Sequence, residues 1–265
     1  MKDLMMLVLL SLGGVLAGTL GGLLGIGGGI LIMPLLRFMV GLDPAQAAGT
    51  CIVAVFFTTL GGSLKHFKLG HIPIRSILPV IFSGLLSTIL FSILFVYFTQ
   101  KEDWLDMATG IVFSFVALRM LWEGVSEYVK QKSGHHGASQ IQGSMTAKLT
   151  IGAIAGVLPG LLGIGTGAVL VPSFAFALNA PIKLAIGSSL ACFSLNALAS
   201  SAFKFAQGVV RTPILVPLCI GTLIGSRFGA TLNGRFSSPV LKALFGLVFV
   251  YVAYKYAGSG VKSLF

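Results

Sequence analysis

Charged residues are scarce in this chain of 265 residues: they make up 9%, whereas hydrophobic residues make up 55%. Soluble domains carry roughly a quarter charged residues. A water-soluble fold of this length would have to expose much of its apolar surface, because about half of its residues face solvent. We therefore expect a protein embedded in a lipid bilayer. Its apolar runs are continuous and do not alternate as barrel strands do, which favours membrane-spanning helices.

Acidic residues are rarer still, and all of them lie at or near predicted helix ends or in loops. They are Asp3, Asp43, Glu102, Asp103, Asp106, Glu123 and Glu127. Cation carriers usually hold carboxylates within their spans, so this placement argues against a sodium or metal substrate. The adjacent His135 and His136 keep a transition-metal carrier open as an alternative.

The sequence also lacks the residue groups that other functions require. Its three cysteines lie in apolar runs, which implies no disulfide framework and no zinc spacing, and we attribute Cys51 to packing. No nucleophile–base pair or carboxylate–histidine cluster lies within the predicted spans, so we expect no enzyme activity, no cofactor and no resident metal. The net charge of +11 comes from basic residues scattered between apolar runs, which is typical of membrane topology signals and not of nucleic-acid binding.

The apolar runs predict about eight to ten membrane segments in two repeats. Many glycines and prolines recur 138 positions apart, among them Gly18 and Gly156, Gly22 and Gly160, Pro34 and Pro172, and Gly70 and Gly208. This recurrence indicates an internal duplication. The predicted fold is an all-α integral membrane protein with a first membrane repeat at 1–126, a polar linker at 127–147 and a second membrane repeat at 148–265.

A glycine cluster interrupts the first apolar segment of each repeat. Glycine costs about 1 kcal/mol relative to alanine in a helix interior, so residues 21–29 and 160–167 should break the helix. We expect two short helices that meet at a glycine turn inside the membrane, either as a re-entrant hairpin or as two short spans. Both arrangements keep Ile30–Val40 in lipid and make the second repeat inverted, although counts of Lys and Arg do not separate inverted from parallel repeats.

The paired glycine turns are the main candidate site. Each precedes a short helix, whose N-terminus exposes unpaired amide hydrogens and a partial positive charge. Such a terminus binds an anion without a charged side chain, and glycine lets a ligand approach the backbone. The alternative is that the glycines serve close helix packing. The predicted residues are Gly25, Gly27, Gly28, Gly29, Gly163, Gly165, Thr166 and Gly167.

Polar residues on the next helix of each repeat extend this prediction. We expect their hydroxyl and amide groups to donate hydrogen bonds to an oxyanion; the alternative is that they donate to backbone carbonyls of their own helix. These residues are Thr50, Thr58, Ser188, Ser189 and Asn196. The basic residues Lys65, His66 and Lys204 lie at the ends of these helices. We expect them either to attract or gate an anion or to face lipid headgroups.

The run from Gly21 to Gly29 with Pro34, repeated from Gly160 to Gly167 with Pro172, resembles the TauE/SafE family of sulfite and organosulfur-anion transporters. Ala48-Gly49-Thr50 and Phe67-Lys68-Leu69-Gly70 also look like that family, and the resemblance runs from about Leu7 to Tyr254. It implies a transporter in a prokaryotic inner membrane, with a substrate path at the two glycine turns and the Thr50/Ser188 region. Thr166 departs from the first copy, which has Gly28 there.

These observations together predict a secondary transporter that moves a small anion by alternating access. Sulfite, sulfoacetate and related organosulfur anions are the expected substrates, and the lipid bilayer is the expected partner. A coupling proton and a homo-oligomer stay open. The rival interpretations are a non-transporting membrane subunit and the transition-metal carrier.

Overall fold

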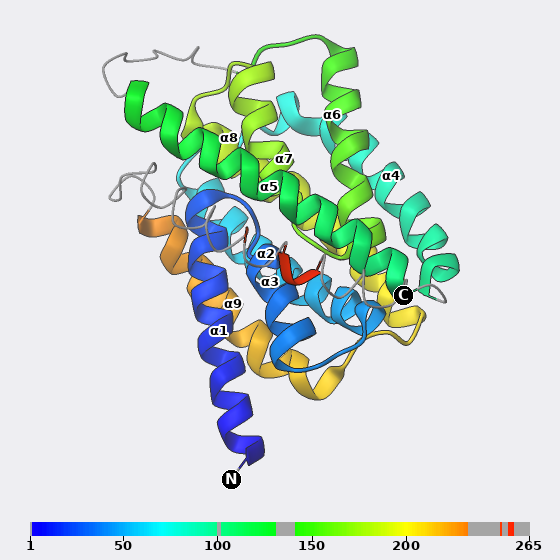
Figure 1. Cartoon of the computed structure of the whole chain (residues 1–265). Helices are drawn as coiled ribbons and strands as arrows, with labels where there is room; N and C mark the ends of the chain where they lie inside the picture. The colour runs from blue at the N-terminus through cyan, green and yellow to red at the C-terminus, as the bar shows by residue number, and fades with distance from the viewer. Residues whose placement is uncertain (1, 100–101, 131–140, 233–249, 251–253, 257–265) are drawn as a thin grey trace. The chain divides into compact units, whose positions relative to one another are not determined.

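The computed structural model describes residues 2–99, 102–130, 141–232, 250 and 254–256, and within them all regular structure is helical (Figure 1). Six helices are long and apolar enough to cross a membrane, and two shorter apolar helices span Gly29–Met39 and Gly167–Ala177. The chain is therefore an integral membrane protein of the all-α class. The sequence has a further apolar run at 239–257, most of which lies outside the described residues.

The longer α-helices are α1 (Lys2–Leu24), α3 (Pro44–Lys68), α4 (Ile74–Thr99), α5 (Glu102–Lys130), α6 (Met145–Val157), α8 (Ile182–Ala206) and α9 (Thr212–Leu232). Of these, α5 is not among the six candidate spans, and α6 forms its span together with the π-helical turn that follows it. The short helices are α2 (Gly29–Pro34) and α7 (Gly167–Pro172), and π-helical turns η1 (Leu35–Met39), η2 (Leu158–Leu162) and η3 (Ser173–Ala177) extend α2, α6 and α7.

The chain forms two compact units. Unit 1 comprises Met1–Val96 and Gly137–Asn233, and unit 2 comprises Tyr97–His136 and Gly234–Phe265. Within unit 2, the rings of Phe113 and Tyr256 stack with centroids 5.5 Å apart. All of the predicted site residues belong to unit 1. The division into repeats at 1–126, 127–147 and 148–265 stays a prediction, and His135 and His136 lie outside the described residues.

Both glycine clusters end a helix, but the first helix of each pair is not short. α1 runs for 23 residues before it ends at Leu24, and α6 with η2 forms an 18-residue span to Leu162. The expectation of two short helices at each turn was therefore wrong for the first partner. Glycines within α1 stay helical because their bare backbone faces pack on another helix, which offsets their low helix propensity.

Two helix pairs pack through glycines set against backbone carbonyls. α1 packs on α9, and α6 packs on α4; at each glycine an added Cβ would come closer to the facing carbonyl oxygen than real Cβ atoms approach. The contacts are Gly14 with Leu218, Gly18 with Thr222 and Gly22 with Ser226 in the first pair, and Gly152 with Val80, Gly156 with Gly84 and Gly160 with Thr88 in the second. Both members of every contact in the second pair lie 138 positions from their counterparts in the first.

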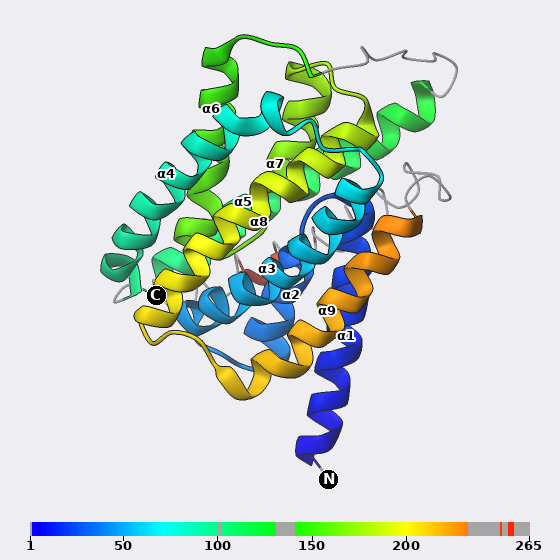
Figure 2. The ribbon, with the colours of Figure 1, turned by 180° about the vertical axis from the view of Figure 1, so that it is seen from behind.

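Helices of unit 1 that lie 138 positions apart in the sequence run in opposite directions. α1 ascends in Figure 1 whereas α6 descends, and the same opposition relates α3 to α8 and α4 to α9. The view from behind in Figure 2 agrees and shows α1 and α9 side by side. This arrangement brings the two glycine-rich turns to the same place within unit 1.

Candidate functional site

The two glycine turns touch each other backbone to backbone. A Cβ at Gly29 would lie 2.9 Å from the amide nitrogen of Gly165. A Cβ at Gly167 would overlap the carbonyl of Gly25 and the Cα of Ile26. Residues 25–30 and 162–168 are all buried. No side chain fits at these positions without displacing the opposite turn.

The first turn needs glycine for its backbone conformation as well. Gly25, Gly27 and Gly28 have φ values of 75°, 77° and 72°, a left-handed region that side chains disfavour. In the second turn, Gly163 has φ of 66° whereas Thr166 has φ of −88°. The backbone therefore accepts a side chain at position 166, which accounts for the departure from the first copy.

Each turn leads directly into a short helix. Gly28 precedes α2, and its carbonyl oxygen accepts hydrogen bonds from the amides of Leu31 and Ile32 at 3.0 and 3.1 Å. Thr166 precedes α7 and caps it through its carbonyl oxygen in the same way. The earliest amides of a helix lack acceptors within it and carry partial positive charge. The Thr166 hydroxyl is buried, caps no amide and has no hydrogen-bond partner. The first amides of α2 and α7 and the Thr166 hydroxyl thus lie together where the two turns meet.

Three side chains from α3 and α8 face these turns. Ser189 donates to the carbonyl oxygen of Gly25 at 3.0 Å, and the Cys51 thiol lies 3.6 Å from the carbonyl oxygen of Gly29. The Phe193 ring would clash with a Cβ at Gly27 and would lie 3.4 Å from one at Gly165. The sequence analysis attributed Cys51 to packing and did not single out Phe193, because a residue in an apolar run carries no local signal that distinguishes a site from packing.

Thr50 and Thr58 have partners of their own. The Thr50 hydroxyl accepts the backbone amide of Arg211 at 3.0 Å and so ties α3 to the segment before α9. Thr58 donates to the carbonyl of Ala54 at 3.1 Å, one turn back on the same helix, although its methyl group borders Gly28. The predicted ligand role of both residues stays a prediction.

Ser188 occupies the position that corresponds to Thr50 but lacks its bond. The residue 138 positions before Arg211 is Pro73, which has no amide hydrogen to donate. The Ser188 hydroxyl is buried without a hydrogen-bond partner. Farther along α8, Asn196 borders Gly84, and its carbonyl oxygen is also without a partner. These two polar groups are therefore available to a ligand or to water.

The predicted basic residues lie at the helix ends and not at the turns. Lys65 is half-buried in the last turn of α3. The Nδ1 atoms of His66 and His71 are 3.1 Å apart, so one imidazole donates to the other. Lys204 is buried, with its Nζ 2.6 Å from the centroid of the Phe95 ring.

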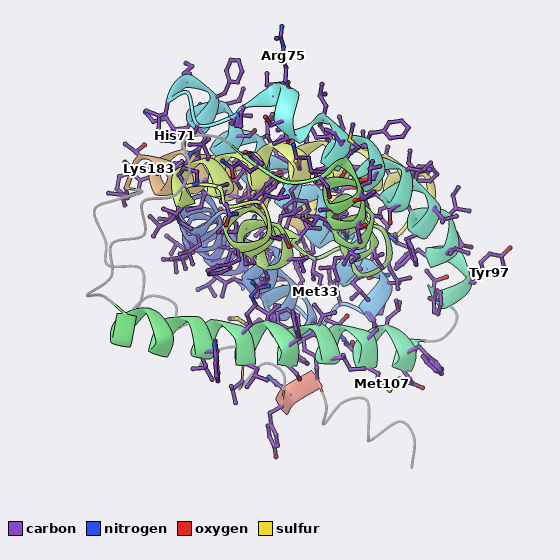
Figure 3. The ribbon with its side chains drawn as sticks, turned by 90° about the horizontal axis from the view of Figure 1, so that it is seen from above. Met33, His71, Arg75, Tyr97, Met107 and Lys183 are labelled. Carbon is purple, nitrogen blue, oxygen red and sulfur yellow. The ribbon has the colours of Figure 1, made fainter. Side chains whose placement is uncertain are left out.

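His71 lies in the segment between α3 and α4, on the same side of unit 1 as Lys183 in Figure 3. Partial burial and the positive charge of Lys183 lower the pKa of His71 below its ordinary value. His71 is therefore neutral in more of the neutral pH range than a free histidine. Among the described residues, no three His, Cys, Asp or Glu side chains are grouped as a metal site.

Comparison with known proteins places these features in a family. The family described as Sulfite exporter TauE/SafE matches residues 10–256. A probable membrane transporter protein of Xylella fastidiosa strain 9a5c is 31% identical over 254 residues, covering 94% of this chain and 93% of that protein. The probable membrane transporter YunE of Bacillus subtilis is 24% identical over 277 residues, covering 98% and 100%.

A shorter match comes from a plant protein. The Sulfite exporter TauE/SafE family protein 2 of Arabidopsis thaliana is 46% identical over 68 residues, which covers 25% of this chain and 15% of that protein. No solved structure matches the chain significantly.

Proposed function

Because the chain belongs to the TauE/SafE family of membrane transporters, we propose that it is a secondary transporter of a small anion such as sulfite, sulfoacetate or a related organosulfur anion. The proposal includes the binding site: the anion binds where the two glycine turns meet. It also includes the absence of enzyme activity and a place in a prokaryotic inner membrane.

The observation that carries the site is the contact between Gly29 and Gly165. Two helix breaks from distant parts of the sequence meet in the buried centre of unit 1. Irregular backbone at membrane depth is tolerated where it is buried in protein or lines a cavity, and it often marks a substrate site in transporters. A slight separation of the turns would expose amides of both segments to a shared ligand.

The chemistry of the surroundings favours an anion. Amide and hydroxyl groups donate hydrogen bonds to an oxyanion without the cost of burying a charge of their own. Thr166 supplies a buried hydroxyl without a partner on the second turn, and Ser188 supplies another on α8, whereas Ser189 already donates its hydroxyl hydrogen to the Gly25 carbonyl. The helices α2, α3, α7 and α8 contain no Asp or Glu to repel an anion.

We further propose that the two halves are inverted repeats that support alternating access. The matched glycine–carbonyl contacts of α1 with α9 and of α6 with α4 support this, as do the opposite directions of corresponding helices (Figures 1 and 2). Inverted repeats give two conformations of similar energy that open to opposite sides. The coupling ion and the oligomeric state are not part of the proposal.

The test uses purified protein in liposomes. We expect saturable uptake of sulfite or sulfoacetate and a rise in the melting temperature with the transported anion, because a ligand stabilises the state that binds it. Chloride and nickel serve as comparison ions. A protein that neither moves nor binds sulfite, sulfoacetate or thiosulfate would contradict the proposal, and stabilisation by nickel alone would favour the metal-carrier alternative.

Two variants connect this activity with the turns. Gly27→Leu and Gly165→Leu should abolish uptake while some folded protein still reaches the membrane, because the new side chains occupy the space between the turns. Normal uptake by both variants would show that the glycines serve packing only. A non-transporting subunit would instead require a co-purifying partner for its stability.

A further inference from the structure

The last turn of α8 buries a lysine that pairs with no carboxylate among the residues the structure describes. Lys204 is 0% exposed, and its Nζ has no hydrogen-bond partner. The ring of Phe95 lies beneath the ammonium, but an aromatic face offsets only part of the cost of burying a charge. The helices α4, α6 and α8 contain no Asp or Glu that could neutralise it. An anionic ligand would supply the missing charge.

Other buried polar atoms of α4 and of the C-terminal end of α8 are also without partners. They are the hydroxyl oxygens of Ser92 and Ser201 and the side-chain carbonyl oxygen of Gln207. The Gln207 amide donates to the backbone carbonyl of Ser92 at 2.8 Å, which joins the end of α8 to α4. So many unsatisfied buried groups at one contact between helices point to a site that a ligand completes.

The helical spacing places these groups together. Ser92 and Phe95 are three residues apart on α4, and Gln207, the residue that follows α8, is three residues from Lys204 in its last turn. Residues three apart are neighbours on a helix surface. Because Gln207 contacts Ser92 and Lys204 contacts Phe95, the ammonium and the Ser92 hydroxyl lie at the same α4–α8 contact.

We propose that Lys204 and Ser92 form a second anion-binding site at this contact, for the same class of small oxyanion or sulfonate that the glycine turns bind. The Lys204 ammonium and the Ser92 hydroxyl donate to the anion, and Gln207 positions Ser92. This inference rests on the proposed function, and it assigns an entry or exit site on one side of the central turns.

The position along α8 separates this site from the turns. Phe193 contacts the glycine turns, and Lys204 follows it by 11 residues, which corresponds to about 16 Å along a helix. Asn196 and Ser200 lie between them, spaced like Lys204 at four-residue intervals on one face. Ser200 donates to the carbonyl of Pro159 at 2.6 Å, whereas the Asn196 carbonyl oxygen has no partner. A polar row thus connects the two sites.

The first half of the chain does not repeat the site. The residue 138 positions before Lys204 is His66. Its imidazole forms a hydrogen bond with His71, whereas Lys204 lies over the ring of Phe95. Of the two helix ends at positions 66 and 204, only the end of α8 therefore buries a lysine amine, which an anionic ligand would hold in its charged form. The second site should act from one side of the membrane only.

The experiment compares purified Lys204→Met, Lys204→Arg and wild type, with Lys68→Met as control because Lys68 is exposed at the end of α3. Without anion, Lys204→Met should melt at a higher temperature than wild type, because it removes an unpaired buried charge. With sulfite or sulfoacetate, its melting temperature should rise less than that of wild type. Its KM for uptake should increase about tenfold or more, as expected from loss of a charged hydrogen bond.

Lys204→Arg should keep most of the affinity, and Lys68→Met should behave like wild type. Should Lys204→Met fail to fold, Ser92→Ala provides the same test, because the Ser92 hydroxyl supports no bond in the protein. An unchanged KM in Lys204→Met, or in Ser92→Ala if that variant replaces it, would overturn the second site and leave the proposed function intact. A wild-type protein that binds and moves no anion would overturn both.

Discussion

Ser189 on α8 donates its hydroxyl hydrogen to the carbonyl oxygen of Gly25 across 3.0 Å, although the two residues are 164 positions apart. The bond ties the second half of the chain to the glycine turn of the first. It also satisfies a buried carbonyl that the end of α1 leaves outside any helix. Ser189 therefore supports the turn even when no ligand is bound.

Ser189→Ala should destabilise the protein by about 1–3 kcal/mol, because the Gly25 carbonyl loses its donor in a buried place. Thermal unfolding of the detergent-solubilised protein measures this effect. Ser194→Ala is the matched control, since Ser194 bonds only the carbonyl of Ala191 on its own helix. Equal melting temperatures for the two variants would contradict the importance of the connection.

Gly27 and Gly70 allow backbone strain to be separated from crowding. Their φ values are 77° and 73°, but a Cβ at Gly70 meets nothing within 4 Å whereas one at Gly27 clashes with Phe193. Gly70→Ala should cost about 1–2 kcal/mol from strain alone. Gly27→Ala should cost about 1–3 kcal/mol more through overpacking and should reduce uptake.

The added substitution Phe193→Leu tests the cause of that extra cost. It removes the ring that a Cβ at position 27 would strike, so the double variant should regain part of the lost stability. A double-mutant cycle measures the coupling between the two positions. If the two effects simply add, the crowding does not come from Phe193.

Thr50 and Ser188 should respond differently to loss of their hydroxyl groups. Thr50→Val removes the acceptor of the Arg211 amide and should lower stability by about 1 kcal/mol. Ser188→Ala removes a hydroxyl without a partner and should leave the melting temperature unchanged or slightly raised. If Ser188 binds the anion, its variant should also lose part of the anion-induced rise in melting temperature.

His71 should make stability fall at acidic pH. Its pKa is lowered in the folded protein, so below the ordinary value of 6.5 the unfolded chain binds more protons than the folded one. Stability is then lost as the pH decreases from about 6.5 towards the lowered pKa. His71→Asn should weaken this dependence below about pH 6.5 in thermal unfolding experiments. An unchanged pH profile would exclude His71 as its source.

Hydropathy and glycine content were sufficient to predict the all-helical membrane fold and the helix breaks after Leu24 and Leu162. These features depend on local chain composition. The partners of the helices were not predictable in the same way. A glycine face on α1 indicates close packing but not that Thr222 of α9 supplies the facing carbonyl.

The candidate site was predicted in part for the same reason. Thr50 accepts a hydrogen bond from Arg211, 161 positions away, and no local pattern indicates such a bond. Phe193 reaches Gly27 only because α8 crosses the first turn. The π-helical turns η1, η2 and η3 also went unpredicted, although each contains or directly follows a proline, which has no amide hydrogen for the α-helical bond: Pro34, Pro159 and Pro172.

The glycine–carbonyl contacts of α1 with α9 and of α6 with α4 restrict how these helices can move. α1 is held by α9, and α6 is held by α4, so each pair combines one helix from either half of the chain. Helices in such close contact resist sliding along each other, because each of these glycines faces one backbone carbonyl of the partner helix. In the proposed transport cycle we therefore expect mixed helix pairs, and not the two halves of the polypeptide, to move as rigid bodies. A half chain produced alone would leave the glycine faces of its helices bare.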